Sequence, residues 1–253
     1  MTQALYILTG ASRGLGAAIA ARWLQRADVS LLCLSRHTNA SLDTAAAASG
    51  ARCEQWAADL AQPAAVASRL QAWLEALDGA AFASASLVNN AGLLTSIGPL
   101  ERCTNDELSA ALRVGLEAPL LLTAAFLRAT SAWRCERRVL NISSGLGRRP
   151  MAGQATYCAA KAGMDHLSRA VALDQAEQPN GARIVSLAPG VIDTDMQVQL
   201  RNAKGEGFPD QATFVQLKET GQLASSDAAA ARVIAYLERS DFGASPVADV
   251  RDA

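Results

Sequence analysis

A tyrosine and a lysine stand four residues apart in the sequence, at Tyr157 and Lys161. The surrounding stretch predicts a helix, on which this spacing places the phenol and the ammonium group on one face. Because a nearby positive charge favours the phenolate, we expect Lys161 to lower the pKa of Tyr157 from its ordinary value of about 10. A tyrosine tuned in this way can act as a general acid that protonates a substrate oxygen.

Ser144 precedes Tyr157 by thirteen residues. Ser144 lies at the end of a predicted strand in the segment Asn141-Ile-Ser-Ser-Gly145, where its hydroxyl can hydrogen-bond a substrate carbonyl. Ser143 is the competing candidate, and serines at strand ends also serve simply as turn formers. Together with Tyr157 and Lys161, Ser144 predicts a site that binds and protonates a carbonyl oxygen.

A glycine-rich turn, Gly10-Ala-Ser-Arg-Gly14-Leu-Gly16, joins the first predicted strand to the first predicted helix. Glycines allow a tight turn and let the backbone approach a pyrophosphate, whose charge then faces the amides of the helix N-terminus. We therefore expect the three glycines, with Ser12 and Leu15, to bind a dinucleotide.

Two arginines near this turn indicate which dinucleotide is bound. Arg13 lies inside the turn, and Arg36 ends the second predicted strand, where an NAD site carries an acidic residue for the ribose 2′-hydroxyl. A guanidinium group at that position matches a 2′-phosphate, whereas a carboxylate would repel it. The sequence therefore predicts NADP(H) as the cofactor.

Short apolar runs alternate with longer helical patterns along the chain. The predicted strands are residues 4–9, 30–35, 52–57, 86–89, 139–143 and 183–188, and the predicted helices are residues 15–26, 63–77, 105–130 and 154–175. The alanine-rich stretches 45–48 and 228–231 also favour helix. This alternation predicts an α/β fold in which residues 1–253 form a single domain, a Rossmann-type doubly wound parallel sheet flanked by helices. Ligands of such sheets bind outside the carboxyl ends of the strands.

The motifs occur in the order and at the intervals of the short-chain dehydrogenase/reductase family, which the sequence resembles over nearly its whole length. They are Thr9-Gly-Ala-Ser-Arg-Gly-Leu-Gly16, Asn89-Asn-Ala-Gly92, Ser144, Tyr157-x-x-x-Lys161 and Pro189-Gly190. The resemblance implies that Tyr157 protonates the carbonyl oxygen, that Lys161 also holds the nicotinamide ribose, and that Ser144 orients the carbonyl.

The resemblance also implies further contacts with the cofactor. They are Asp59 and Leu60 on the adenine side, Asn89, Ala91 and Gly92 along the cofactor, and Pro189, Gly190, Ile192 and Thr194 near the nicotinamide carboxamide.

One position departs from the family pattern. Family members usually carry an asparagine on the long helix before the catalytic strand, and here the stretch reads Val114-Gly115-Leu116. The implied role of that asparagine is to hold a water that relays protons to the lysine, which Gly115 cannot do with a side chain. We expect the enzyme to remain active. Without this proton relay, its turnover can be lower.

Several segments resemble one branch of the family, the sepiapterin reductases and their bacterial relatives that reduce aromatic diketones such as benzil. They are residues 157–165, 188–197 and 217–223, with Asp241-Phe242 and Asp249 near the C-terminus. In sepiapterin reductases, an aspartate at the position of Asp249 anchors the pterin substrate. Two interpretations stay open, because Asp249 could instead cap the last strand or pair with Arg251.

Composition and charge also indicate which kinds of partner and location we do not expect. A net charge of -1 gives no basic field for nucleic acid, so we expect no nucleic-acid partner. Five scattered cysteines and two histidines, His37 and His166, form no metal-binding pattern, so we expect neither a metal nor a disulfide framework. The sequence has no secretory signal pattern and no run of about 18 uninterrupted apolar residues, so we expect a cytoplasmic protein without a membrane segment.

The sequence thus predicts an NADPH-dependent reductase of a small-molecule carbonyl substrate. The alternative is a regulatory protein of the same fold that binds NADP(H) with little or no turnover, a possibility that Gly115 keeps open. Residues 202–209, which contain two glycines and a proline, predict a mobile loop over the active site. The outer faces of the helices at residues 105–130 and 154–175 predict a homodimer or homotetramer.

Overall fold

Parallel strands form the centre of the fold in the computed structural model, which describes residues 3–203 and 207–252. Within these residues the sheet has seven strands in the order β3-β2-β1-β4-β5-β6-β7. Their bounds are β1 Gln3–Thr9, β2 Val29–Ser35, β3 Arg52–Ala57, β4 Phe82–Asn89, β5 Glu136–Ile142, β6 Arg183–Ala188 and β7 Val247–Asp249. Most strand positions are buried on both faces, as in sheets covered by crossover helices.

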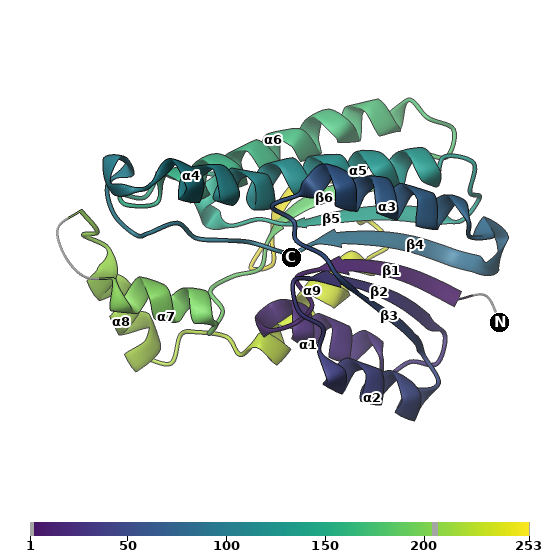
Figure 1. Cartoon of the computed structure of the whole chain (residues 1–253), viewed down its shortest axis with the longest axis horizontal. Helices are drawn as coiled ribbons and strands as arrows, with labels where there is room; N and C mark the ends of the chain where they lie inside the picture. Colours follow the sequence, from purple (N-terminus) through teal and green to yellow (C-terminus); the bar gives the residue numbers. More distant parts are fainter. Residues whose placement is uncertain (1–2, 204–206, 253) are drawn as a thin grey trace.

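Helices cover both faces of this sheet (Figure 1). On one face lie α3 Pro63–Glu75, α4 Asn105–Leu112, α5 Ala118–Ala129 and α6 Ala155–Ala176, and on the other lie α1 Gly14–Trp23, α2 Ala40–Ser49 and α9 Ser226–Leu237. Each face has its own apolar core, one around Ile19, Trp23 and Val233 and the other around Leu70 and Phe126. The predicted Rossmann-type fold is therefore confirmed.

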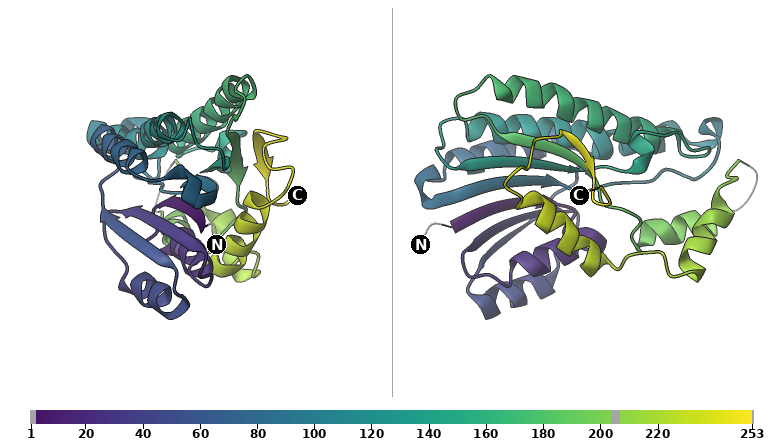
Figure 2. Two further views of the ribbon diagram at one scale, coloured as in Figure 1. Left: turned by 90° about the vertical axis from the view of Figure 1, so that its right-hand side faces the viewer. Right: turned by 180° about the vertical axis from the view of Figure 1, so that it is seen from behind.

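Two further helices, α7 Asp195–Asn202 and α8 Gln211–Glu219, lie beyond the carboxyl ends of the strands (Figure 2). Leu200, Phe208 and Phe214 form a small apolar cluster there. The predicted mobile loop, residues 202–209, begins at the last residue of α7, and residues 204–206 of that prediction lie outside the described residues. The described part of the prediction includes Phe208, whose side chain is buried against the cluster.

Strands β4 and β5 begin three or more residues earlier than the sequence predicts. Strand β4 starts at Phe82 instead of residue 86, and the added residues include Phe82 and Ala85, which are buried in the core. Strand β5 starts at Glu136 instead of residue 139, because its charged side chains find partners. Arg137 donates to the carbonyl of Asn180, and Arg138 donates to Glu136 at 2.7 Å.

The helix predicted at residues 105–130 is continuous but irregular. A capping box on Thr104 starts α4, and a π-helical turn, η3 Arg113–Glu117, separates α4 from α5. Pro119 has no N–H to donate to the carbonyl of Gly115, so the regular helical bond is lost and the chain takes the wider turn. Gly115 is thereby buried against α6, where an added Cβ would lie 3.1 Å from the Cβ of Ala160.

This run, Asn105–Ala129, is long and apolar enough to cross a membrane by length and composition alone. It packs against α3 and against α6 as part of the helix layer over the sheet. The core helices of soluble folds pass the same test of length and composition, so the run carries no membrane assignment here.

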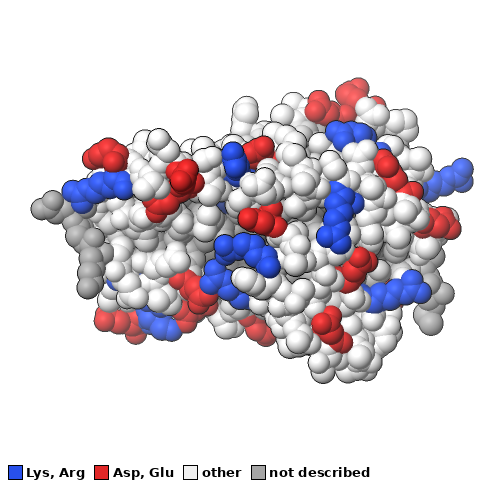
Figure 3. All heavy atoms as spheres, viewed as in Figure 1, with Lys and Arg blue, Asp and Glu red and all other residues white. Residues whose placement is uncertain are grey.

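Side chains of both charges are interspersed over the face of the molecule shown in Figure 3. This distribution agrees with the net charge of -1. A mixed surface of this kind produces no large field of one sign on the face that is shown.

Candidate active site

A cavity of about 1010 Å³ opens at the carboxyl ends of the strands. It spans the point between β1 and β4 where the strand order reverses, which is the usual ligand site of doubly wound sheets. Its walls bring together nearly all of the predicted site residues: Gly10, Ser12, Arg13, Gly14, Leu15, Gly16, Arg36, Asp59, Leu60, Ala91, Gly92, Ser144, Tyr157, Lys161, Pro189, Gly190, Ile192, Thr194 and Asp249. Residues from distant parts of the chain therefore share one cavity.

The glycine-rich turn forms one end of this cavity. Gly10 and Gly14 have φ angles of +72° and +56°, a conformation that L side chains rarely adopt. At Gly16 an added Cβ would lie 2.1 Å from the carbonyl oxygen of Gly10, so only glycine lets α1 start this close to β1. The open turn, directly before the N-terminus of α1, fits the phosphates of a dinucleotide.

Asn90 fastens the turn from the neighbouring strand end. Its side-chain Nδ2 donates to the carbonyl oxygens of Thr9 at 2.9 Å and Gly10 at 3.3 Å. The hydroxyl oxygen of Thr9 accepts the backbone N–H groups of Asn90 and Ala91, both at 2.9 Å. These bonds hold the ends of β1 and β4 together beneath the cavity.

Arg13 and Arg36 are exposed and line the same end of the cavity. Arg13 forms an ion pair with Asp195, in the first turn of α7. Among the described residues no carboxylate lies within ion-pair distance of Arg36, which stands directly after β2. Of these two arginines, Arg36 is the one whose guanidinium group has no ion-pair partner among the described residues.

Asn89 is the one predicted site residue that does not line the cavity. Its side chain is buried below the cavity, donating to Asn141 at 2.8 Å and to Thr123 at 3.3 Å, and it does not line the cavity. Asn90, which the prediction omitted, occupies the wall instead. In a strand, neighbouring side chains point to opposite faces, and the sequence Asn89-Asn90 does not tell which of the two faces the ligand.

The buried asparagines help to position the helix that carries Tyr157. Asn141 on β5 accepts from Asn89 and donates to the hydroxyl of Ser168 on α6 at 2.9 Å. This chain of hydrogen bonds links β4, β5 and α6 in the protein interior, where each polar group needs a partner. The second half of α6, which contains Ser168, is therefore fixed against β5.

Tyr157 and Lys161 lie in the first turns of α6, as the spacing predicts. The Nζ atom of Lys161 is 5.6 Å from the centre of the Tyr157 ring and donates to the carbonyl of Ile142 at 2.7 Å. Ser144 follows β5, at the start of a short 3₁₀ turn, η4 Gly145–Gly147, and its oxygen accepts the N–H of Leu146 at 3.2 Å. All three side chains line the cavity.

Ser143 does not compete with Ser144 for the role of carbonyl partner. Its side chain is buried, and its hydroxyl donates to the carboxylate of Asp165 at 2.5 Å. The neighbouring Ser144 hydroxyl remains half-buried at the cavity wall. Both serines line the cavity, but the hydroxyl of Ser143 is already bonded to Asp165, whereas that of Ser144 lies beside Tyr157.

The expectation that Lys161 lowers the pKa of Tyr157 is wrong for the chain without a bound ligand. Desolvation by the surrounding protein raises the pKa of Tyr157 to about 12, and the hydrogen bond with Ser144 lowers it only in part. Burial also lowers the pKa of Lys161 to about 8, against the opposing effect of the Asp165 carboxylate. The spacing reveals the proximity of the two groups but not the cost of removing them from water.

The segment after β6 forms the opposite wall of the cavity. Gly190 has a φ of +84°, Ile192 makes an isolated bridge with Ala224, and Thr194 directly precedes α7. The carboxylate of Asp193 accepts from Lys218 on α8 at 2.5 Å. The wall that carries Ile192 and Thr194 is therefore tied to the two outer helices.

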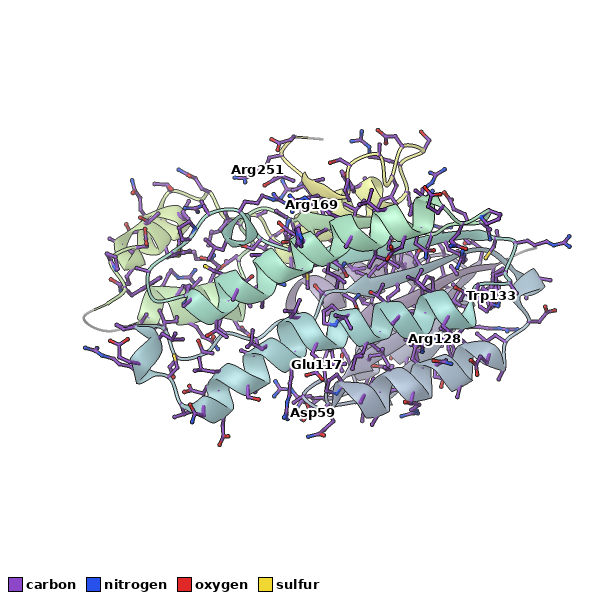
Figure 4. All side chains as sticks on the ribbon, turned by 90° about the horizontal axis from the view of Figure 1, so that it is seen from above. Asp59, Glu117, Arg128, Trp133, Arg169 and Arg251 are labelled. Atoms are coloured by element: carbon purple, nitrogen blue, oxygen red, sulfur yellow. The ribbon has the colours of Figure 1, made fainter. Side chains whose placement is uncertain are left out.

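Asp249 is buried and already has a partner. Its carboxylate accepts from the Nε and NH2 groups of Arg251 at 2.8 and 2.6 Å, and Arg148 lies 3.9 Å away. The hydrogen bonds to Arg251 lower the pKa of this carboxyl. Figure 4 shows Arg251 and Asp59 on opposite sides of the helix layer that contains α5 and α6. Of the two interpretations of Asp249, these contacts support the pairing with Arg251.

The sequence motifs do not identify the residues at the substrate end of the cavity. Besides the motif residues, the cavity is lined by Leu94, Leu146, Met151, Leu200 and Phe214 and by Arg149 and Arg251. Four of the five apolar side chains, all except Leu146, belong to the cluster that contains Phe208. These residues lie in loops and outer helices, where no fixed spacing marks them. His37, which the sequence left without a role, also lines the cavity beside Arg36.

Comparison with known proteins identifies the family. The family model described as short chain dehydrogenase matches residues 4–205. The chain therefore belongs to the short-chain dehydrogenase/reductase family of oxidoreductases.

Two relatives match nearly the whole chain. A benzil reductase ((S)-benzoin forming) from Bacillus cereus is 33% identical over 236 residues, covering 93% of this chain and 94% of its own. A sepiapterin reductase from Meriones unguiculatus is 32% identical over 259 aligned residues, covering 98% and 97%. The branch of the family expected from the sequence is thus confirmed by its relatives.

Solved structures share the fold over the same length. A short-chain dehydrogenase/reductase from Burkholderia vietnamiensis is 36% identical, with a TM-score of 0.66 over 99% of this chain and 98% of its own. A metagenomic short-chain oxidoreductase in complex with NADP is 27% identical, with a TM-score of 0.71 over 98% and 95%.

Proposed function

We propose that the chain is an NADPH-dependent carbonyl reductase that acts on a ketone or diketone. The observation that carries the proposal is the convergence of Ser144, Tyr157 and Lys161 on the cavity that also contains the glycine-rich turn. One group that can donate a proton and one that can hold a carbonyl thus lie next to a fitting nucleotide site.

The residues around the glycine-rich turn would hold the cofactor. Gly10, Gly14 and Gly16 would cradle its phosphates at the start of α1, and Asp59 and Leu60 would lie beside the adenine. Arg36 would pair with the 2′-phosphate, because its guanidinium group has no carboxylate partner among the described residues. Arg13 would contribute only after releasing Asp195, its present partner.

The chain's own residues would handle the proton and the orientation of the substrate. When bound, the reduced nicotinamide supplies the hydride for the carbonyl carbon. The Ser144 hydroxyl would hydrogen-bond the carbonyl oxygen, and the Tyr157 hydroxyl would donate its proton to the same oxygen. The ammonium of Lys161 would stabilise the negative charge left on Tyr157 and bind the nicotinamide ribose.

An aromatic diketone such as benzil suits the substrate end of the cavity better than a pterin does. Leu94, Leu146, Met151 and Phe214 offer an apolar wall for aromatic rings. A sepiapterin-type substrate would need the Asp249 carboxylate, which would first have to exchange its ion pair with Arg251. The benzil reductase from Bacillus cereus supports the same choice.

We further propose a cytoplasmic homodimer or homotetramer that binds its small-molecule substrate without nucleic acid or membrane. The outer helices α4, α5 and α6 carry exposed leucines that a second copy could cover. Leu112, Leu120 and Leu173 expose 39%, 43% and 73% of their surface. Figure 4 views this helix layer from outside, with Arg169 on α6 and Arg128 on α5.

Arg36→Asp tests the choice of cofactor. The variant loses a charge-assisted hydrogen bond to the 2′-phosphate, so kcat/KM for NADPH should fall about 10- to 100-fold. The value of kcat/KM for NADH, which has no 2′-phosphate, should change little or rise. Arg52→Asp, the same charge change at the exposed start of β3, is the matched control. Equal losses with both nucleotides in steady-state kinetics would refute the assignment to NADPH.

The pH dependence of ketone reduction tests the proposed role of Lys161. Its pKa of about 8 means that the ammonium is present below pH 8 and is lost as the pH rises through that value. Tyr157, with a pKa of about 12, stays protonated over the same range. We expect kcat/KM to fall across pH 8, and a profile that stays flat well above pH 8 would contradict this role.

A comparison of benzil with sepiapterin tests the substrate class. We expect benzil to be reduced readily, as followed by the loss of NADPH absorbance, and Asp249→Asn to change its kcat/KM only a few-fold. Preferred reduction of sepiapterin, abolished by Asp249→Asn, would instead establish the pterin substrate. NADPH binding without turnover of any diketone, pterin or quinone would favour the regulatory alternative.

A further inference from the structure

A buried carboxylate lies one helical turn beyond Lys161. Asp165 on α6 is 2% exposed, and Lys161 is 4% exposed. On a helix, residues four apart lie on one face, so the two side chains share the same interior region. Asp165 does not line the cavity, and the mechanism proposed above does not use it.

One oxygen of this carboxylate accepts two hydrogen bonds, and the other lies beside an arginine but has no hydrogen-bond partner among the described residues. Oδ1 accepts the hydroxyl of Ser143, after β5, at 2.5 Å and that of Ser186, on β6, at 2.7 Å. Oδ2 lies 3.3 Å from the Nε of Arg148, which follows the η4 turn. An added Cβ on Gly147 would lie 2.9 Å from Oδ2, so the turn packs directly on the carboxylate.

The surroundings of Lys161 contain few charges besides this one. On β5, the carbonyl of Ile142 accepts a hydrogen bond from Lys161. The η3 turn packs on α6 through Gly115, which lies against Ala160 and carries no charge. On α6 itself the other titratable neighbours are Tyr157 and Cys158. Arg148 reaches Asp165 and also lies 3.9 Å from Asp249 on β7. Asp165 is therefore the carboxylate that opposes the burial of the Lys161 ammonium.

We propose that Asp165 is a positioning residue of the active site, which keeps Lys161 protonated and anchors the strand end that presents Ser144. The carboxylate supplies a compensating negative charge inside the protein, where an unpaired ammonium is costly. Its hydrogen bond fixes Ser143, which directly precedes Ser144 in the chain. The catalytic relevance rests on the proposed function, but the effect on the charge of Lys161 does not.

The sequence makes a direct measurement possible, because the chain contains three lysines, Lys161, Lys204 and Lys218. Protein labelled with ¹³C at the lysine ε-carbon gives one NMR resonance for each, so the pKa of Lys161 can be read by pH titration without any substrate. Lys161→Met assigns the Lys161 resonance. Lys218, which pairs with Asp193, is an internal reference.

Asp165→Asn removes the charge and keeps the size and an acceptor for the two serines. We expect the pKa of Lys161 to fall by about one unit, because the variant removes the negative charge that favours the ammonium. Asp174→Asn, the same change at an exposed position on the same helix, is the matched control. A pKa shift in Asp165→Asn no larger than that in Asp174→Asn would overturn the proposal.

A second variant covers the case in which Asp165→Asn fails to fold. Arg148→Gln removes the cation that shares the carboxylate, and its side chain is 31% exposed, so the fold should tolerate the change. We expect the pKa of Lys161 to rise in this variant, and an unchanged value would contradict the proposal.

Activity separates this inference from the proposed function. With benzil and NADPH, the fall of kcat/KM at alkaline pH should move to lower pH in Asp165→Asn by the same amount as the NMR pKa. A shifted NMR pKa without any ketone turnover in the native chain would leave the role of Asp165 intact and refute the proposed reaction.

Discussion

The burial of the Lys161 ammonium is the constraint on which the site depends. An ammonium removed from water is unfavourable, and the fold compensates it with a carbonyl at the end of β5 and a carboxylate one turn along α6. These partners belong to elements that meet only when β5, β6 and α6 are in register. The fold therefore lowers the pKa of Lys161, and it also holds the ammonium at a fixed place beside Tyr157.

The other residues of the cavity are brought together at the same edge of the sheet. Parallel strands bring their carboxyl ends to one side, so the glycine-rich turn after β1, Asn90 after β4 and Ser144 after β5 come together although they are far apart in sequence. Glycine at position 16 lets α1 start close to β1, and the asparagines on β4 and β5 hold α6 above them. Motifs separated along the chain thus act as one site.

Sequence reasoning predicted the features that depend on residue type and spacing. The alternation of apolar runs predicted the sheet, and the spacing of Tyr157 and Lys161 predicted their common helix face. It could not choose between Asn89 and Asn90, because the facing of a strand-end side chain is decided by the local backbone. It also gave the wrong direction for the pKa of Tyr157, since desolvation depends on packing. The charged start of β5 and the apolar substrate wall were missed because their partners lie far away in sequence.

The most direct test of the central claim is Tyr157→Phe, measured for both NADPH binding and ketone reduction. Removing the hydroxyl deletes the proton donor and leaves the ring, so turnover should fall by about 100- to 10,000-fold with NADPH affinity nearly unchanged. Tyr236→Phe, outside the cavity, is the control and should behave like the native chain. A Tyr157→Phe variant that reduces the ketone as fast as the native protein would contradict the account.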